Sequence, residues 1–154
     1  SGGLVGSEMC IRDRHIAGIP GDIFIQDYLP KCSEIQKAQI AKEYVKFNER
    51  CMIRLLGDMR SYNYVVIPIH DFDQVIYKIR AIDFDQQCFE GKFSVYRPQF
   101  FKENKAMMDI VRAKLKTDSI TQYKIEERST ISRINIYLGI YYEKNSHSYC
   151  FFMQ

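Results

Sequence analysis

The chain has 154 residues and a net charge of +3, with 22 basic against 19 acidic side chains. This small excess of positive charge gives no basis for a nucleic-acid surface, and no run approaches the roughly 18 apolar residues that span a bilayer. The hydrophobic content of 46% is typical of one soluble globular domain. We therefore expect neither a nucleic-acid nor a membrane partner.

The five cysteines form no CxxC pair, and the three histidines lie far from them in sequence. This pattern does not predict a zinc site. An odd number of cysteines without paired spacing is more typical of reduced, buried thiols than of a disulfide framework. We therefore expect a cytoplasmic setting.

Residues 1–14, SGGLVGSEMCIRDR, lack the basic region and apolar core of a signal peptide. The string LVGSEMCIRDR resembles the in-frame translation of a transposase-end sequencing adapter. We predict that residues 1–14 are a non-native segment and that the chain after them is a truncated piece of a longer protein. The alternative is a flexible native N-terminus, which leaves the same residues without a function.

The first expected element is a short β-like run over Ile23–Ile25, which Pro30 closes. A helix over 34–56 follows, because apolar residues recur there at intervals of three and four. Ser33 and Gln36 have the spacing of a capping box at its start. Gly57 is the expected stop, because glycine adopts a left-handed conformation most easily.

A β-hairpin is expected next, with strands over 64–69 and 75–82 and the polar turn HDFDQ between them. Such a hairpin carries Asn63 just before its first strand and Asp83 just after its second. Because the strands of a hairpin are antiparallel, Asn63 and Asp83 are expected to lie close together.

Two helices are expected after the hairpin, over 101–116 and from a capped start at Ser119 to about residue 133. The stretch RPQFFKEN contains two phenylalanines that could cover a ligand, and we interpret them as a buried loop anchor. Two charged groups, Arg50 with Arg54 and the cluster over 126–128, are interpreted as solvated helix faces. The aromatic-rich residues 136–154 are either a late strand pair or a frameshifted tail.

The candidate functional residues are Asp58, Asn63 five positions later, and Asp83 at the far end of the hairpin. Phosphoryl transfer uses a carboxylate to orient or deprotonate the acceptor hydroxyl, and acidic and amide oxygens to hold Mg²⁺ on the phosphates. The order of glycine-aspartate loop, hairpin and second aspartate resembles that of protein-kinase-like enzymes, in which these groups carry out phosphoryl transfer.

The stretch GDMRSYN resembles the GDxxxxN loop of aminoglycoside-phosphotransferase-like and HipA-like kinases, and IDFD resembles their metal-binding motif. The resemblance covers about residues 34–85. It implies that Asp58 is the catalytic base and that Asn63, Asp83 and Asp85 bind Mg²⁺ and the nucleotide. It also implies that Arg60 contacts the transferred phosphate.

On this basis we expect an α+β fold over 15–135, a mostly helical kinase-like C-lobe fragment whose β-hairpin carries the catalytic and metal-binding loops. The expected parent is an ATP- and Mg-dependent kinase acting on a protein or small-molecule hydroxyl. Residues 15–33 are too few for an N-lobe, which is the expected intramolecular partner. Alone, the fragment is expected to be inactive, because positioning supplies most of the rate in this chemistry.

Two alternatives stay open. Leu56 stands where the family usually has histidine, and no glycine-rich loop precedes it, which favours a non-catalytic interaction module or pseudokinase-like remnant. The second alternative is a metal-dependent hydrolase that uses four carboxylates, Asp71, Asp73, Asp83 and Asp85.

Overall fold

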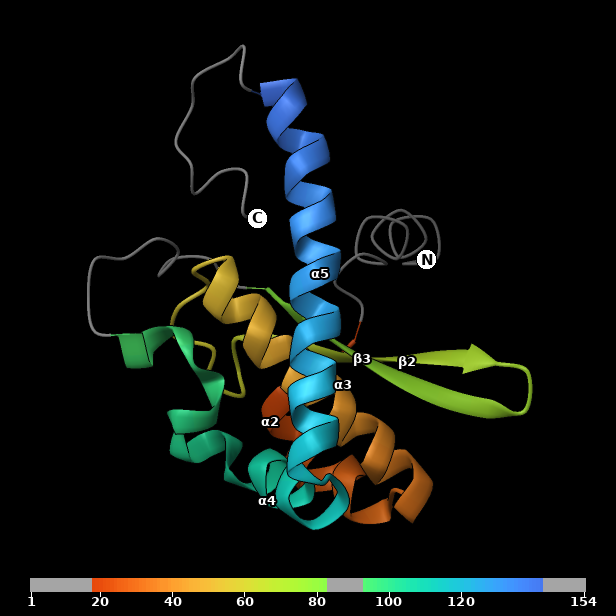
Figure 1. The fold of residues 1–154 in the computed structure, drawn as a ribbon. Helices are drawn as coiled ribbons and strands as arrows, with labels where there is room; N and C mark the ends of the chain where they lie inside the picture. The colour runs from red at the N-terminus through yellow and green to blue at the C-terminus, as the bar shows by residue number, and fades with distance from the viewer. Residues whose placement is uncertain (1–17, 83–92, 143–154) are drawn as a thin grey trace, which may run out of the picture.

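A computed structural model of the chain describes residues 18–82 and 93–142, with side chains described as far as residue 133 (Figure 1). It is a mixed α and β structure, as expected. Three antiparallel strands form one sheet in the order β1-β2-β3. The main elements are β1 (Ile19–Pro20), α2 (Gly21–Ile23), α3 (Glu34–Ile53), β2 (Tyr64–Asp71), β3 (Gln74–Ala81), α4 (Lys105–Lys114) and α5 (Thr117–Tyr142).

Helix α3 begins at the predicted capping box. The Ser33 amide donates to Oε1 of Gln36 at 2.9 Å, and the Gln36 amide donates to Oγ of Ser33 at 3.2 Å. Two of the amides that a helix start leaves unpaired are thereby satisfied. The helix then buries Tyr44 and Phe47 in the core and contacts β3, α4 and α5.

The end of α3 differs from the prediction. Helix α3 ends at Ile53, and the left-handed residue after it is Leu55, with φ 53°, whereas Gly57 has no positive φ. The Leu56 amide donates to the Cys51 carbonyl at 2.9 Å, which closes a Schellman motif. The prediction failed because the position of the stop was inferred from residue type, whereas the burial of Leu56 fixes the register of the turn.

Replacing Leu55 with glycine is expected to raise the free energy of unfolding by about 0.5–1 kcal/mol, because a left-handed leucine is strained and glycine is not. Urea denaturation of the two proteins measures the difference. The control is Ile53→Gly, two residues earlier at the end of the right-handed helix, which is expected to be destabilising. A loss of stability in Leu55→Gly would show that packing of the Leu55 side chain outweighs the strain.

The β-like run predicted at Ile23–Ile25 is wrong. These residues lie in α2 and in the π-helix η1 (Phe24–Tyr28), which the 3₁₀ turn η2 (Leu29–Lys31) follows. Tertiary contacts override the local pattern here: the Phe24 ring is fully buried, with its centroid 5.3 Å from that of Tyr77. Gly21 permits the close approach of α2 to the start of β2, because a Cβ there would lie 2.3 Å from the Ser61 carbonyl oxygen.

The predicted hairpin is confirmed. Strands β2 and β3 pair from Tyr64 with Ala81 out to Asp71 with Gln74, so only two residues form the turn. The half of the hairpin nearest β1 is buried, and the outer half extends beyond the helices (Figure 1). The tip therefore projects into solvent while the base lies in the core.

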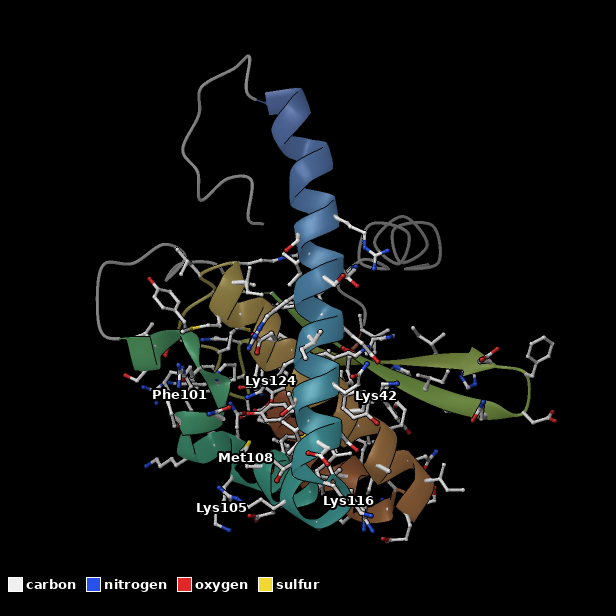
Figure 2. All side chains as sticks on the ribbon, viewed as in Figure 1. Lys42, Phe101, Lys105, Met108, Lys116 and Lys124 are labelled. Carbon is white, nitrogen blue, oxygen red and sulfur yellow. The ribbon has the colours of Figure 1, made fainter. Side chains whose placement is uncertain are left out.

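The later helices are also present, with different bounds. Helix α5 continues to Tyr142, so a strand pair starting at residue 136 is wrong for residues 136–142, and 143–154 lie outside the described residues. Helix α4 begins at Lys105, four residues after the predicted start, and α5 begins at Thr117, so Ser119 lies inside it and does not cap it. Both helices contact α3. In the α3–α5 contact, Nζ of Lys42 lies 4.8 Å from the centre of the Tyr123 ring (Figure 2).

The interpretation of the charged groups on α3 and α5 as solvated faces is wrong for Arg50 and Glu127, which are largely buried, whereas the Arg128 side chain is 56% exposed. Arg50 donates to Oε1 of Glu43 at 2.7 Å and to Oε1 of Glu127 at 3.1 Å. Arg128 donates to Oε1 of Glu49 at 2.5 Å. The Arg50–Glu127 and Glu49–Arg128 pairs join the two helices, so they belong to the contact that holds α5 on α3, whereas the Arg50–Glu43 pair lies within α3.

Candidate functional site

The loop over 58–63 is a tightly bonded turn at the base of the hairpin. Asp58 has a left-handed backbone with φ 56°. The Arg60 amide donates to the Asp58 carbonyl at 2.8 Å, and the Asn63 amide donates to the Arg60 carbonyl at 2.9 Å. A non-glycine residue with positive φ is uncommon, and such residues cluster at functional sites.

The structure brings together three of the residues predicted from sequence. Nδ2 of Asn63 donates to the Asp58 carbonyl at 2.7 Å and approaches the Asp58 Oδ2 at 3.4 Å. Nε of Arg60 donates to the other carboxylate oxygen, Oδ1, at 2.9 Å. Asn63 is buried and Asp58 is about one-third exposed, so the carboxylate remains accessible from outside.

Arg60 joins this group to a residue that sequence analysis missed, Glu103 in η5 (Lys102–Asn104). Nη1 of Arg60 donates to Oε1 of Glu103 at 3.1 Å, and the guanidinium lies 4.9 Å from the centre of the Phe101 ring. Hydrogen bonding to Asp58 raises the pKa of the Arg60 guanidinium above its usual value. The guanidinium therefore stays charged between two carboxylates.

The second Glu103 oxygen completes this arrangement. Oε2 of Glu103 is buried and has no hydrogen-bond partner among the described residues. Hydrogen bonding to its own backbone amide, assisted by Arg60, lowers the pKa of the Glu103 carboxyl below its usual range. The site thus contains an ionised carboxylate beside the Arg60 guanidinium.

A second missed residue, Asn104, holds the loop from beneath. Its side chain is fully buried and donates to the carbonyls of Met59 and Pro98, both at 2.9 Å. Its oxygen accepts from the Tyr64 hydroxyl at 2.8 Å. Burial raises the pKa of Tyr64 well above its usual value, so this hydroxyl stays protonated and donates. The two phenylalanines of RPQFFKEN are not the expected buried anchor, because Phe100 is 58% exposed and Phe101 is only partly buried. The buried residues of this stretch are Pro98 and Asn104.

Leu56, where the kinase resemblance leads one to expect histidine, lies in the hydrophobic core. The loop backbone is instead held by hydrogen bonds from two other side chains. Asn104 donates to the Met59 carbonyl, and Asn63 donates to the Asp58 carbonyl. The loop geometry therefore depends on two buried amides and not on a side chain at position 56.

The C-terminal end of β3 lies beside the loop over 58–63. The Ile82 amide donates to the Asn63 carbonyl at 3.1 Å, and the Asp58 amide donates to the Val95 carbonyl, in η3 (Phe93–Tyr96), at 3.0 Å. Asp83 follows Ile82 directly in the sequence, but Asp83 and Asp85 lie outside the described residues.

The four-carboxylate alternative fits the fold poorly. Asp71 and Asp73 lie at the hairpin tip, whereas Ile82, the neighbour of Asp83, lies at the base. Seven strand residues at about 3.3 Å each separate tip from base by about 23 Å. Over residues 18–82 and 93–142, no group of three or more His, Cys, Asp or Glu side chains is placed to hold a metal ion.

Comparison with protein-family models, with curated proteins and with solved structures finds no match for this chain. Within the described part of the chain, no helix is both long enough and apolar enough to cross a membrane.

Proposed function

We propose that the chain is the C-lobe portion of an ATP- and Mg²⁺-dependent phosphotransferase. The observation that carries the proposal is the contact between Asp58 and Asn63 beside Ile82, at the base of one hairpin. It supports the proposal because catalysis of phosphoryl transfer is mainly positioning, and these contacts fix the loop from several sides.

The donor atoms near the loop suit a hard dication. Because the Asn63 amide nitrogen donates to Asp58, its oxygen is the atom left for a cation. Carboxylate and amide oxygens are the ligands that Mg²⁺ prefers. In the proposal Asn63, Asp83 and Asp85 hold Mg²⁺, which when bound neutralises charge on the phosphates of ATP.

Asp58 orients the acceptor hydroxyl of a protein or small molecule and takes its proton. The hydroxyl oxygen forms a bond to the γ-phosphorus while the bond to the β–γ bridging oxygen breaks, and ADP leaves with that electron pair. The resemblance implied that Arg60 contacts the transferred phosphate. Its bonds to Asp58 and Glu103 instead support the role of a positioning residue that sets the direction of the Asp58 carboxylate.

The proposal assigns the adenine and the α- and β-phosphates to an N-lobe, the intramolecular partner that such kinases use. Mg²⁺-ATP binding by the protein carrying both lobes, measured by calorimetry, tests it. Asn63→Ala and Asp83→Asn are expected to weaken binding about tenfold or more, because each removes a metal ligand. Asp73→Asn at the hairpin tip is the matched control and is expected to bind as the parent does.

A non-catalytic interaction module is the second candidate, favoured by one observation. Both carboxylate oxygens of Asp58 already have partners in Arg60 and Asn63, an arrangement that equally suits a purely structural role. In that case neither the parent nor Asp83→Asn binds Mg²⁺-ATP. Equal binding by the parent, Asp83→Asn and Asn63→Ala would contradict the proposed metal ligands.

A further inference from the structure

The outer half of the β2–β3 hairpin leaves one edge of β2 uncovered. Strand β1 pairs with β2 only at Val65 and Val66, and the hairpin continues beyond the helices to its two-residue turn (Figure 1). Over residues 67–71, no other described strand pairs with the side of β2 that faces away from β3. A strand edge of this kind offers backbone amides and carbonyls to another strand and so promotes pairing between copies of a chain.

The apolar composition of β2 also favours such pairing. The run YVVIPI over 64–69 contains three β-branched residues in succession, a fourth after the proline, and no charged side chain. Of these residues, Ile69 lies in the outer half of the hairpin and is 43% exposed. Short exposed segments with high β propensity and low charge are those that stack edge to edge.

The hydrogen bonds of Tyr77 show which hairpin residues face outward. The Tyr77 amide donates to Oε1 of Gln39 at 2.9 Å, and the Tyr77 carbonyl accepts from Nε2 of Gln39 at 3.0 Å. Tyr77 and its partner in β2, Pro68, are therefore a non-hydrogen-bonded pair, in which both backbones point away from the neighbouring strand. Because such pairs alternate along antiparallel strands, His70 faces outward as Pro68 does.

Pro68 removes a donor from the uncovered edge of β2. Proline has no amide N–H, so inside a sheet it is tolerated where the nitrogen points away from the neighbouring strand. Position 68 meets this condition, because its nitrogen faces away from β3 and no bond of the β2–β3 ladder is lost. A strand that approaches β2 from outside meets the exposed proline ring where it requires an amide.

Helix α3 covers the opposite edge of the hairpin with side chains. The Gln39 side-chain amide makes with Tyr77 both hydrogen bonds that an adjacent strand would make. Two positions further along β3, Nη2 of Arg50 donates to the Ile79 carbonyl at 3.0 Å. A strand can pair with β3 there only by displacing these bonds, so each edge of the hairpin is obstructed by a different device.

We infer that Pro68 at the β2 edge and Gln39 at the β3 edge keep two copies of the chain from associating through their hairpins. In a twofold pairing of two β2 strands centred on Ile69, Pro68 of each copy faces His70 of the other. Each proline then removes an amide donor from the pairing, and its ring occupies the space that the second strand would enter.

Sedimentation velocity of the 154-residue chain over a wide range of concentration tests the β2 edge. Pro68→Val supplies the missing amide on a residue that suits a strand, so we expect the association constant to rise about tenfold or more above that of the unchanged chain. Ile69→Val is the matched control, because the backbone of residue 69 bonds to Ile76 within the hairpin. This variant should associate as the unchanged chain does.

A second proline makes the test specific to the edge. His70→Pro removes the other outward-facing amide, so the double variant Pro68→Val with His70→Pro should associate no more than the unchanged chain. In Pro68→Val alone, hydrogen exchange at the His70 amide should slow as concentration rises, because association pairs that amide. Pro68→Thr replaces Pro68→Val if circular dichroism shows that the latter is unfolded.

Three results would overturn the inference for Pro68. These are association of Pro68→Val no stronger than that of Ile69→Val, exchange at His70 that does not depend on concentration, and a double variant that associates as Pro68→Val does. For the β3 edge, Gln39→Ala is expected to associate more strongly than the unchanged chain, with exchange at the Tyr77 amide slowing as concentration rises. Association of Gln39→Ala equal to that of the unchanged chain would exclude the role of Gln39.

Discussion

Replacing Asn104 with alanine is expected to lower the free energy of unfolding by about 3 kcal/mol. The side chain is fully buried and makes three hydrogen bonds, to the carbonyls of Met59 and Pro98 and from the hydroxyl of Tyr64. With alanine at this position, the two carbonyls and the Tyr64 hydroxyl lose their hydrogen-bond partner. An unsatisfied buried polar group is unfavourable by about 1–3 kcal/mol. Urea denaturation should show a lower midpoint at an unchanged slope.

Asn48→Ala is the matched control, because Asn48 is another buried asparagine. It donates to the Tyr44 carbonyl within its own helix at 2.8 Å and accepts from the Gln99 amide at 3.0 Å. Its loss should destabilise the fold by about 1 kcal/mol and leave the site intact. Amide hydrogen exchange at Asn63 should therefore accelerate more in Asn104→Ala than in Asn48→Ala. Equal acceleration in both variants would contradict a specific role for Asn104 under the loop.

Glu43→Ala is the second substitution expected to be strongly destabilising, by about 3 kcal/mol. The Glu43 side chain is only 2% exposed and forms an ion pair with Arg50 at 2.7 Å. Removing it leaves the Arg50 charge with Glu127 at 3.1 Å and the Ile79 carbonyl at 3.0 Å, but without its shortest partner. Thermal and urea unfolding of the variant measure the loss.

The double replacement Glu43→Met with Arg50→Met is expected to recover most of this stability. A buried ion pair is often replaceable by apolar side chains of similar volume, whereas an unpaired buried charge is not tolerated. Asp109→Ala, which removes an exposed pair with Lys105, should change the stability by no more than about 0.5 kcal/mol. A double variant as unstable as Glu43→Ala would show that Arg50 contributes chiefly through Glu127.

Local signals predicted the elements that depend on neighbouring residues. The capping box at Ser33 and the alternating pattern of the hairpin are set by contacts within a few positions, so a single sequence contains them. The run Ile23–Ile25 was predicted wrongly because its helical form depends on Phe24 packing against Tyr77, more than fifty positions away. The same limit explains why the left-handed residue is Leu55 and not Gly57.

The candidate site likewise contains residues that local spacing predicts and residues that it does not. The spacing of Asp58 and Asn63 predicted a contact that the loop makes, because both residues belong to one turn. Glu103 and Asn104 reach this turn from some forty positions along the chain, and no spacing rule connects them to it. The charges of Arg50 and Glu127 were interpreted as solvated because such side chains form the same pattern whether they face water or another helix.

The bonds from Ile82 to Asn63 and from Asp58 to Val95 have a consequence for the stretch between them, residues 83–94. Both ends of this stretch are attached to one short loop, so the rest of the fold already brings them together. The entropy of closing such a ring grows only slowly, by about 0.6 kcal/mol for each doubling of its length. Insertions between 86 and 94 are therefore compatible with an unchanged Asp58–Asn63 turn, and the length of the chain can change there without unfolding the domain.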